Sequence, residues 1–121
     1  MMTSDLNRDR VMTHDRASRA YADGCFDLMH AGHFNALRQA SYLTKWLVVG
    51  PNSDEEILKY KGPTILTSEE RFTLCKAIKW ADEVVKDAPY VVSEDVLDQY
   101  NCQAYVHGDD PVLNLKGEDV C

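Results

Sequence analysis

Four short segments of this chain have the residue pattern of β-strands. Residues 46–50, WLVVG, form a continuous apolar run of the kind found in strands that are buried on both faces. Three shorter β-prone runs share this character: RAYADG at 19–24, EVV at 83–85 and AYVHG at 104–108. We therefore predict four strands, each separated from the next by a segment of a different pattern.

Three helices are predicted between these strands. The first begins near Gly32, where apolar positions start to recur at helical spacing. The second opens with a capping box, in which Thr67 caps the helix and Glu70 bonds back to it. The third is capped by Ser93 and continues to Tyr100. The side chains predicted to be buried by these helices are Phe34, Leu37, Ala40 and Leu43, then Phe72, Cys75 and Ile78, and finally Val96, Leu97 and Tyr100.

The order β-α-β-α-β-α-β predicts a Rossmann-like α/β fold, a doubly wound parallel sheet with right-handed crossovers. Residues 51–63, a segment that begins and ends with proline, are predicted to form a loop with room for one helical turn. In such sheets, ligands bind beyond the carboxyl ends of the strands. Three polar segments fall at those ends: DGCFDLMHAGH, GPNSD and HGDD.

Composition agrees with one small domain. A chain of 121 residues buries roughly two thirds of the surface that its unfolded form exposes. We assign residues 19–121 to the domain and residues 1–18, which are polar and mixed in charge, to a disordered tail.

The net charge of −7 argues against nucleic acid or an anionic membrane as the main partner. No apolar run approaches the ~18 residues of a membrane span, and the tail lacks a signal-peptide core, so a cytoplasmic protein is expected.

The cysteines predict neither a disulfide framework nor a zinc site. None of the four belongs to a C-x-x-C pair, and their spacing matches no zinc module. We expect reduced thiols and no protein-bound metal. The cysteines are Cys25, Cys75, Cys102 and Cys121.

The run HAGH places two imidazoles where the first strand meets its helix. His30 and His33 are three residues apart, so both rings can face one cleft. The helix start adds free N–H groups, and Gly32 has no side chain where an anion must approach the backbone. This arrangement favours a polyphosphate whose developing charge the histidines would stabilise. Two structural histidines and half of a metal site are the alternatives that the spacing leaves open.

Further candidates fall at the same edge of the sheet. Lys61, in KYKGP, is suited to a phosphate, although Lys59 could serve instead and a loop lysine is often only solvated. Asp27, Asp109 and Asp110 could hold magnesium or bond a ribose hydroxyl. The last two could equally be turn residues ahead of a proline.

Together these segments resemble the HxGH nucleotidylyltransferase superfamily in its cytidylyltransferase form. The likeness begins at DGCFDLMHAGH and continues in the family's order through VGPNSDEEI, KGPTILTSEER, AIKWADEVVKDAPYV, LDQYNC and VHGDD, over about residues 20–119. The ethanolamine-phosphate enzymes are the most similar, because Tyr90 follows AP where the choline-phosphate enzymes typically have Trp. The AIKW and YNC runs also look more like the ethanolamine form.

The resemblance implies a Rossmann-like fold of the nucleotidylyltransferase type and an activity in phospholipid biosynthesis. The enzyme would transfer CMP from CTP to phosphoethanolamine, giving CDP-ethanolamine and pyrophosphate, with Mg²⁺ delivered by CTP. The family also implies a homodimer, or pairing with a second cytidylyltransferase domain. It implies a cytoplasmic enzyme, with peripheral association at the endoplasmic reticulum as a further alternative.

The resemblance assigns each candidate residue a role. His30 and His33 would donate hydrogen bonds to the α- and β-phosphates, and Lys61 would bridge the phosphates of the two substrates. Tyr90 would line the pocket for the amine, and Arg71 would support the phosphate loop or a dimer contact. The residues implied to border the nucleotide are Cys25, Phe26, Asp27, Asp109 and Asp110, with Gly24 and Gly32 in supporting positions.

Two features depart from the family's pattern. Pro51 stands where the family's strand commonly continues as V-G-V. The sequence also stops at Cys121, before the R-T-x-G-[IV]-S-T segment that grips the triphosphate and before a second, similar half. We expect either a fragment or a shortened protein with weak or no catalysis. The alternatives that stay open are a cytidylyltransferase for phosphocholine or glycerol 3-phosphate, and a non-catalytic CTP-binding or dimerisation module.

Overall fold

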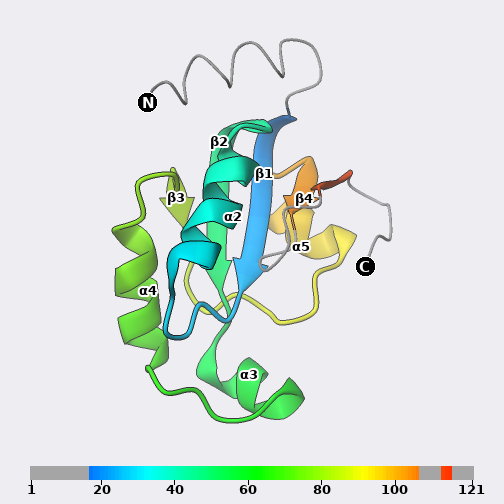
Figure 1. Ribbon diagram of the computed structural model, residues 1–121. Coiled ribbons are helices and arrows are strands. Elements are labelled where there is room, and N and C mark those ends of the chain that lie inside the picture. Colours follow the sequence, from blue (N-terminus) through cyan, green and yellow to red (C-terminus); the bar gives the residue numbers. More distant parts are fainter. Residues whose placement is uncertain (1–16, 107–112, 116–121) are drawn as a thin grey trace.

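The computed structural model describes residues 17–106 and, as backbone only, residues 113–115 (Figure 1). Most of the predicted tail, together with Asp109 and Asp110, lies outside the described residues. In chain order the elements are β1 (Ala17–Gly24), α2 (Ala31–Ser41), β2 (Thr44–Pro51), α3 (Asp54–Tyr60), α4 (Ser68–Lys76), β3 (Glu83–Val84), α5 (Glu94–Gln99), β4 (Ala104–Val106) and β5 (Leu113–Leu115).

The strands form one sheet in the order β3-β2-β1-β4-β5. The pairs β1–β2, β1–β4 and β2–β3 are parallel, and β5 joins β4 in the antiparallel direction. Because the chain moves outward from β1 to one edge and then returns to the other, the predicted doubly wound α/β fold is confirmed. β1 begins at Ala17, two residues earlier than the predicted domain boundary.

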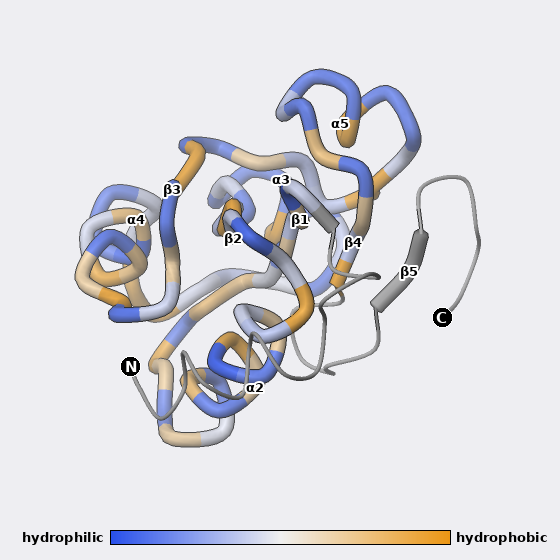
Figure 2. The backbone as a smooth tube through the Cα atoms, turned by 90° about the horizontal axis from the view of Figure 1, so that it is seen from above, coloured by the Kyte–Doolittle hydropathy of each residue, from blue (hydrophilic) through white to orange (hydrophobic). Residues whose placement is uncertain are grey.

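Helices cover both faces of this sheet (Figures 1 and 2). Helices α2 and α4 pack on one face through Leu37 and Cys75, and α5 packs on the other through Leu97. Successive strand residues alternate between the two cores, so Val49 of β2 belongs to the first and Val48 to the second. Burial of each such side chain contributes about 1.5–3 kcal/mol, and this fixes the register of the strands.

The predicted capping box of α4 is confirmed. Thr67 Oγ1 accepts a hydrogen bond from the Glu70 amide at 3.1 Å, and Glu70 Oε1 accepts one from the Thr67 amide at 3.0 Å. Ser93 does stand at the N-cap of α5, but its side chain makes no capping hydrogen bond. Pro51 is compatible with the sheet, because it is the last residue of β2 and pairs with Gly24.

The prediction of a loop with room for one helical turn at residues 51–63 understates the helix there, because α3 extends over seven residues. The Ser53 hydroxyl caps this helix by accepting a hydrogen bond from the Glu56 amide at 3.1 Å. Three acidic residues in the first turn complement the helix dipole, and Ile57 is buried. The signal was present in the sequence as S-x-x-E, which is itself a capping box pattern.

Some of the residues predicted to be buried are placed differently. Arg71 is fully buried, whereas Phe72 is half-buried, with the ammonium groups of Lys76 and Lys86 over its ring. Leu43 follows the end of α2 and is half-buried, as are Phe34, Val96 and Tyr100. Trp46 opens the predicted buried run but is 42% exposed. Leu37, Ala40, Cys75, Ile78 and Leu97 are buried as predicted.

Candidate active site

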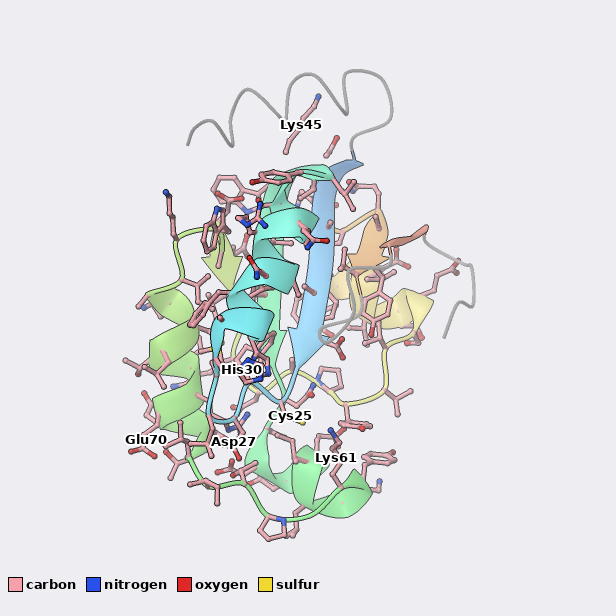
Figure 3. All side chains as sticks on the ribbon, in the orientation of Figure 1. Cys25, Asp27, His30, Lys45, Lys61 and Glu70 are labelled. Atoms are coloured by element: carbon pink, nitrogen blue, oxygen red, sulfur yellow. The ribbon has the colours of Figure 1, made fainter. Side chains whose placement is uncertain are left out.

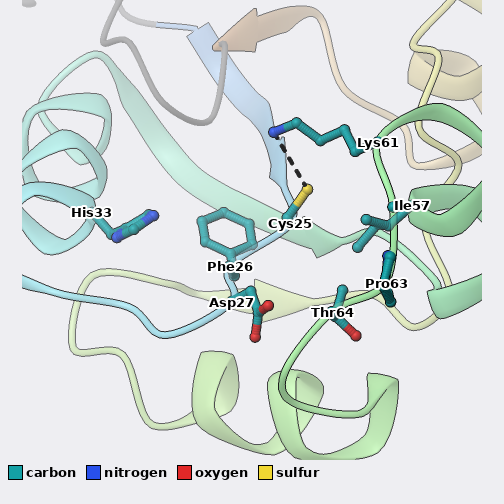
Figure 4. Close-up of a pocket in the computed structure, with 9 residues that line it drawn as sticks. Cys25, Phe26, Asp27, His33, Ile57, Lys61, Pro63 and Thr64 are labelled. Atoms are coloured by element: carbon teal, nitrogen blue, oxygen red, sulfur yellow. Dashed lines mark hydrogen bonds between the residues drawn. The ribbon is translucent and has the colours of Figure 1, made fainter.

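A pocket of about 300 Å³ lies beyond the carboxyl ends of β1 and β2 (Figure 4). Its lining comes from two segments that are far apart in sequence: the loop before α2 with the first turn of that helix, and α3 with the chain that follows it. His33 stands on one side, and Lys61 extends over the opposite side. The lining residues are Cys25, Phe26, Asp27, His33, Ile57, Lys61, Gly62, Pro63 and Thr64.

The loop between β1 and α2 turns sharply around Phe26. Both Phe26 and Leu28 have a φ of 52°, a left-handed conformation that few side chains adopt. The Phe26 ring is buried and folds back over Gly24, where an added Cβ would lie 3.2 Å from the ring. Gly24 therefore supports the site by leaving space for this ring, and the turn presents Cys25 and Asp27 to the pocket.

His30 and His33 cap the start of α2 with their own side chains. The His30 ring accepts a hydrogen bond at Nδ1 from the Gly32 amide at 3.0 Å. The His33 ring accepts one at Nδ1 from the His30 amide at 3.1 Å. The ring centroids are 4.4 Å apart in an edge-to-face arrangement. The structure brings the two histidines together as predicted, but only His33 lines the pocket, and His30 lies beside it, exposed.

Lys61 is the lysine that reaches the pocket. It follows α3 directly, and its amide donates to the Ile57 carbonyl at 2.7 Å. Its ammonium group lies 4.0 Å from the sulfur of Cys25. Lys59, the alternative, places its ammonium over the Tyr60 ring, 5.3 Å from the centroid, and does not line the pocket. In Figure 3, Lys61 gathers with Cys25 and His30 at one end of the sheet, whereas Lys45 lies at the opposite end.

Asp27 lines the pocket but is already engaged by the backbone. Its two carboxylate oxygens accept hydrogen bonds from the amides of Ile65 and Leu66, at 2.8 and 3.0 Å. These bonds tie the loop before α2 to the segment that follows Lys61. Asp27 thus supports the wall of the pocket, a role that the sequence did not predict.

Arg71 connects the segments that form the pocket. Its buried guanidinium donates to the carbonyls of Cys25 at 2.8 Å, Asn52 at 2.7 Å and Leu66 at 3.2 Å. It also pairs with the carboxylate of Asp54 at 2.6 Å. Of the two roles predicted for Arg71, support of the phosphate loop matches this geometry. A dimer contact does not, because the side chain is fully buried.

Asp54 links α3 to α4, a role that was not predicted from its sequence. Partial burial acts to raise the pKa of its carboxyl, but the hydrogen bonds from Arg71 and Ser68 outweigh this and lower it. The carboxylate therefore joins the start of α3 to α4 while remaining charged. The acidic run after Ser53 was the available signal, and the partner of Asp54 could not be read from it.

Tyr90 lies outside the pocket lining. Its ring stacks on that of Tyr60, with centroids 4.8 Å apart and an angle of 10° between the planes. Its amide donates to the carboxylate of Glu56 at 2.9 Å. Tyr90 therefore lies against α3, beside Tyr60, an aromatic neighbour that the sequence did not indicate. Its predicted role in holding the amine stays a prediction.

Two kinds of feature are absent from the part of the chain that the structure describes. No group of three or more histidine, cysteine or acidic side chains there is arranged to hold a metal ion. None of the helices within residues 17–106 combines the length and hydropathy that crossing a bilayer requires.

The chain is similar to known proteins over most of its length. A sequence profile described as cytidylyltransferase-like matches residues 21–120. An ethanolamine-phosphate cytidylyltransferase of Dictyostelium discoideum is 52% identical over 89% of this chain, and one of Mus musculus is 50% identical over 86%. Choline-phosphate cytidylyltransferase 2 of Arabidopsis thaliana is 41% identical over 85%. The chain spans only 30%, 26% and 34% of the lengths of these three relatives.

A solved structure shares the fold. A lipopolysaccharide core biosynthesis protein from Thermoplasma volcanium superposes with a TM-score of 0.54 at 28% sequence identity. The match covers 56% of each chain.

Proposed function

This chain belongs to the cytidylyltransferase-like family, and on that premise we propose that it forms part of an enzyme that transfers CMP from CTP to phosphoethanolamine. The products are CDP-ethanolamine and pyrophosphate, in the synthesis of a phospholipid headgroup. The observation that carries the proposal is the placement of His33 and Lys61 across one pocket at the carboxyl ends of parallel strands. The chain is identical to two ethanolamine-phosphate cytidylyltransferases at 52% and 50% of the aligned positions, and this supports phosphoethanolamine as the acceptor.

The proposed reaction is an in-line displacement at the α-phosphorus of CTP. A phosphate oxygen of phosphoethanolamine forms the new P–O bond as the bond to the bridging α–β oxygen breaks, and pyrophosphate leaves. No covalent bond to the protein is required. The protein's contribution is therefore to position the two substrates and to stabilise charge. The imidazoles donate hydrogen bonds to the phosphates of CTP, and the Lys61 ammonium offsets the charge of both substrates where they meet.

We propose that Mg²⁺ enters with CTP, bound to the triphosphate oxygens. Asp27 is the carboxylate in the pocket lining, and both of its oxygens accept backbone amides. This donor set suits a metal that is held chiefly by phosphate, as Mg²⁺ usually is. When bound, Mg²⁺ would supply positive charge to offset that of the leaving pyrophosphate. We expect elemental analysis of the purified protein to find no stoichiometric zinc, and a tightly bound zinc ion would contradict this assignment.

Calorimetry with CTP and Mg²⁺, run beside an assay for pyrophosphate release, tests the function. The proposal predicts CTP binding to the chain, and CDP-ethanolamine formation when phosphoethanolamine is added to the active enzyme. Binding without turnover by the 121-residue chain would favour a nucleotide-binding module instead. Absence of CTP binding would exclude both functions for this chain.

Cys25 provides an independent test of where CTP binds. We expect saturating MgCTP to slow the alkylation of Cys25 by iodoacetamide, because this thiol lines the pocket. Burial raises the pKa of the Cys75 thiol to about 12 and that of Cys102 to about 11, so neither should react appreciably with or without nucleotide. Peptide-level mass spectrometry measures each rate. An unchanged Cys25 rate under conditions where calorimetry detects binding would place CTP elsewhere.

Acceptor preference is expected to favour phosphoethanolamine over phosphocholine. A quaternary ammonium is held best by an aromatic cage with Trp faces, whereas a primary ammonium can donate three hydrogen bonds. Tyr90 offers a smaller aromatic face and a hydroxyl, and stacking on Tyr60 already covers part of that face. We expect Tyr90→Trp to narrow the preference.

The measurement is kcat/KM for both acceptors at saturating CTP, for the wild type and for Tyr90→Trp. Lys45→Ala, which changes an exposed residue at the far end of the sheet, is the control. Equal or better use of phosphocholine by the wild type would reassign the acceptor to choline phosphate. It would leave the proposed functions of His30, His33 and Lys61 unaffected.

A further inference from the structure

The stack of Tyr60 and Tyr90 joins the last residue of α3 to the loop that follows β3. The ring centroids are 4.8 Å apart and the two planes are inclined by only 10°, so one face of the Tyr90 ring lies against Tyr60. A cation can reach that face of Tyr90 only if the Tyr60 ring moves away.

The backbone that carries Tyr90 is held against the same helix and against the end of β2. The Tyr90 amide donates a hydrogen bond to the Glu56 carboxylate at 2.9 Å. The buried side-chain amide of Asn52 donates to the carbonyls of Pro89 at 2.9 Å and Ala88 at 3.4 Å. The position of Tyr90 beside Tyr60 is therefore set by the backbone as well as by the contact between the rings.

The outer face of this aromatic pair already holds a cation. The ammonium group of Lys59 lies 5.3 Å from the centroid of the Tyr60 ring, within the range of a cation–π contact. Since Tyr90 covers the other face of Tyr60, this ammonium lies on the side away from Tyr90. Both faces of Tyr60 are therefore occupied, and an ammonium that approached the outer face would meet a like charge.

The stack is next to the residue that the proposed function assigns to the acceptor phosphate. Tyr60 directly precedes Lys61, which lines the pocket. In phosphoethanolamine and phosphocholine, two carbon atoms separate the nitrogen from the phosphate ester oxygen, so the amine remains near the groups that surround Lys61. The two acceptors differ only in the three methyl groups of phosphocholine, and discrimination between them must act at the ammonium.

The two kinds of ammonium need different partners. A primary ammonium can donate three hydrogen bonds to oxygen acceptors. A quaternary ammonium has no N–H group and is held mainly by aromatic faces. Covering a face of Tyr90 therefore removes a contact on which phosphocholine depends more than phosphoethanolamine does.

We propose that Tyr60 is a specificity-determining residue, which disfavours quaternary ammonium acceptors by occupying a face of Tyr90 that would otherwise bind them. This inference rests on the proposed function, in which Tyr90 borders the amine of the acceptor. Lys59 assists through its charge on the outer face, and Glu56 assists by holding the Tyr90 backbone. Specificity then comes from an arrangement that is unfavourable for the wrong acceptor, and not only from contacts with the right one.

Acceptor kinetics of the active enzyme test the role of Tyr60. Tyr60→Ala should raise kcat/KM for phosphocholine by about 10-fold, the size of one regained cation–π contact. The unfolding midpoint should change little, because Tyr60 is the last residue of α3 and is 47% exposed. Tyr60→Phe keeps the ring and should retain the wild-type preference. Damage to the fold would lower kcat/KM for both acceptors, so a gain for phosphocholine is diagnostic. An unchanged kcat/KM for phosphocholine in a folded Tyr60→Ala variant would overturn the proposal.

NMR of the tyrosine rings provides a second test that needs no turnover. With ¹³C-labelled tyrosine, tetramethylammonium chloride should shift the Tyr90 ring signals in Tyr60→Ala but not in the wild type or in Tyr60→Phe. Sodium chloride at the same concentration controls for ionic strength. Equal shifts in the wild type and Tyr60→Ala would overturn the proposal even if the enzyme is active. Absence of turnover by the wild-type enzyme would instead refute the proposed function, and the ring shifts would still decide whether Tyr60 keeps a quaternary ammonium away from Tyr90.

Discussion

His33→Ala is expected to lower kcat of the active enzyme by about 10²–10³-fold, because removing one preorganised donor to a reacting phosphate typically costs about 3–4 kcal/mol. His33 stands in the pocket wall, on the opposite side from Lys61. His30→Ala should have an effect of similar size, because the His30 ring is part of the same pair. Pyrophosphate release at saturating substrates measures kcat.

The loss of activity should not come from unfolding. Both rings lie at the start of α2, where loss of a helix cap costs about 1 kcal/mol. Each variant should therefore unfold with a free energy only about 1 kcal/mol below that of the wild type, too small a loss to explain the fall in kcat. Lys45→Ala serves as a control for substitution away from the site and should keep normal turnover. Near-normal kcat in both histidine variants would remove these residues from the proposed mechanism.

Arg71→Met is expected to lower the free energy of unfolding by about 3–5 kcal/mol, because three backbone carbonyls would lose their donor, at about 1–3 kcal/mol for each that is left buried and unpaired. The fully buried guanidinium donates to three backbone carbonyls and to Asp54. Methionine fills similar space but donates no hydrogen bond, so these acceptors would lose their partner. Urea unfolding measures the change.

Matched variants assign the effect to the geometry of the guanidinium. Arg71→Lys keeps the charge, but a single ammonium cannot reach the same set of acceptors, so we expect much of the loss to persist. Asp54→Asn should destabilise far less, because the Asp54 side chain is 44% exposed and water screens its charge. A wild-type unfolding free energy in Arg71→Met would show that the loops around the pocket do not depend on this residue.

The Asp54–Arg71 pair also predicts a dependence on pH. The pKa of Asp54 is lowered in the folded state, so its contribution to stability is present above the unfolded pKa and disappears as pH falls through the folded pKa. The wild type should therefore lose more stability than Asp54→Asn between neutral and acidic pH. Equal losses in the two proteins would show that the pair contributes nothing to acid sensitivity.

The doubly wound α/β class, and the edge of the sheet where the candidate residues gather, could be predicted from the sequence. Strand and helix periods depend on residues close in sequence, and so do helix caps such as the one between Thr67 and Glu70. The parallel topology then places HAGH and the segment that contains Lys61 at one edge of the sheet. Local signals are misread where two of them compete, as in α3, where flanking prolines obscured the N-cap at Ser53.

Only the tertiary structure decided the partners of polar side chains that bond to distant parts of the chain. Arg71 donates a hydrogen bond to the carbonyl of Cys25, 46 residues away, and Asp27 accepts one from the amide of Leu66, 39 residues away. Tyr90 stacks on Tyr60 across a similar gap in the chain. No local pattern encodes such pairs, because they depend on how separate loops approach one another once the sheet has formed. For this reason the sequence could suggest that Arg71 supports the site, but only the folded chain shows it buried, with its hydrogen bonds shared among the loops that form the pocket.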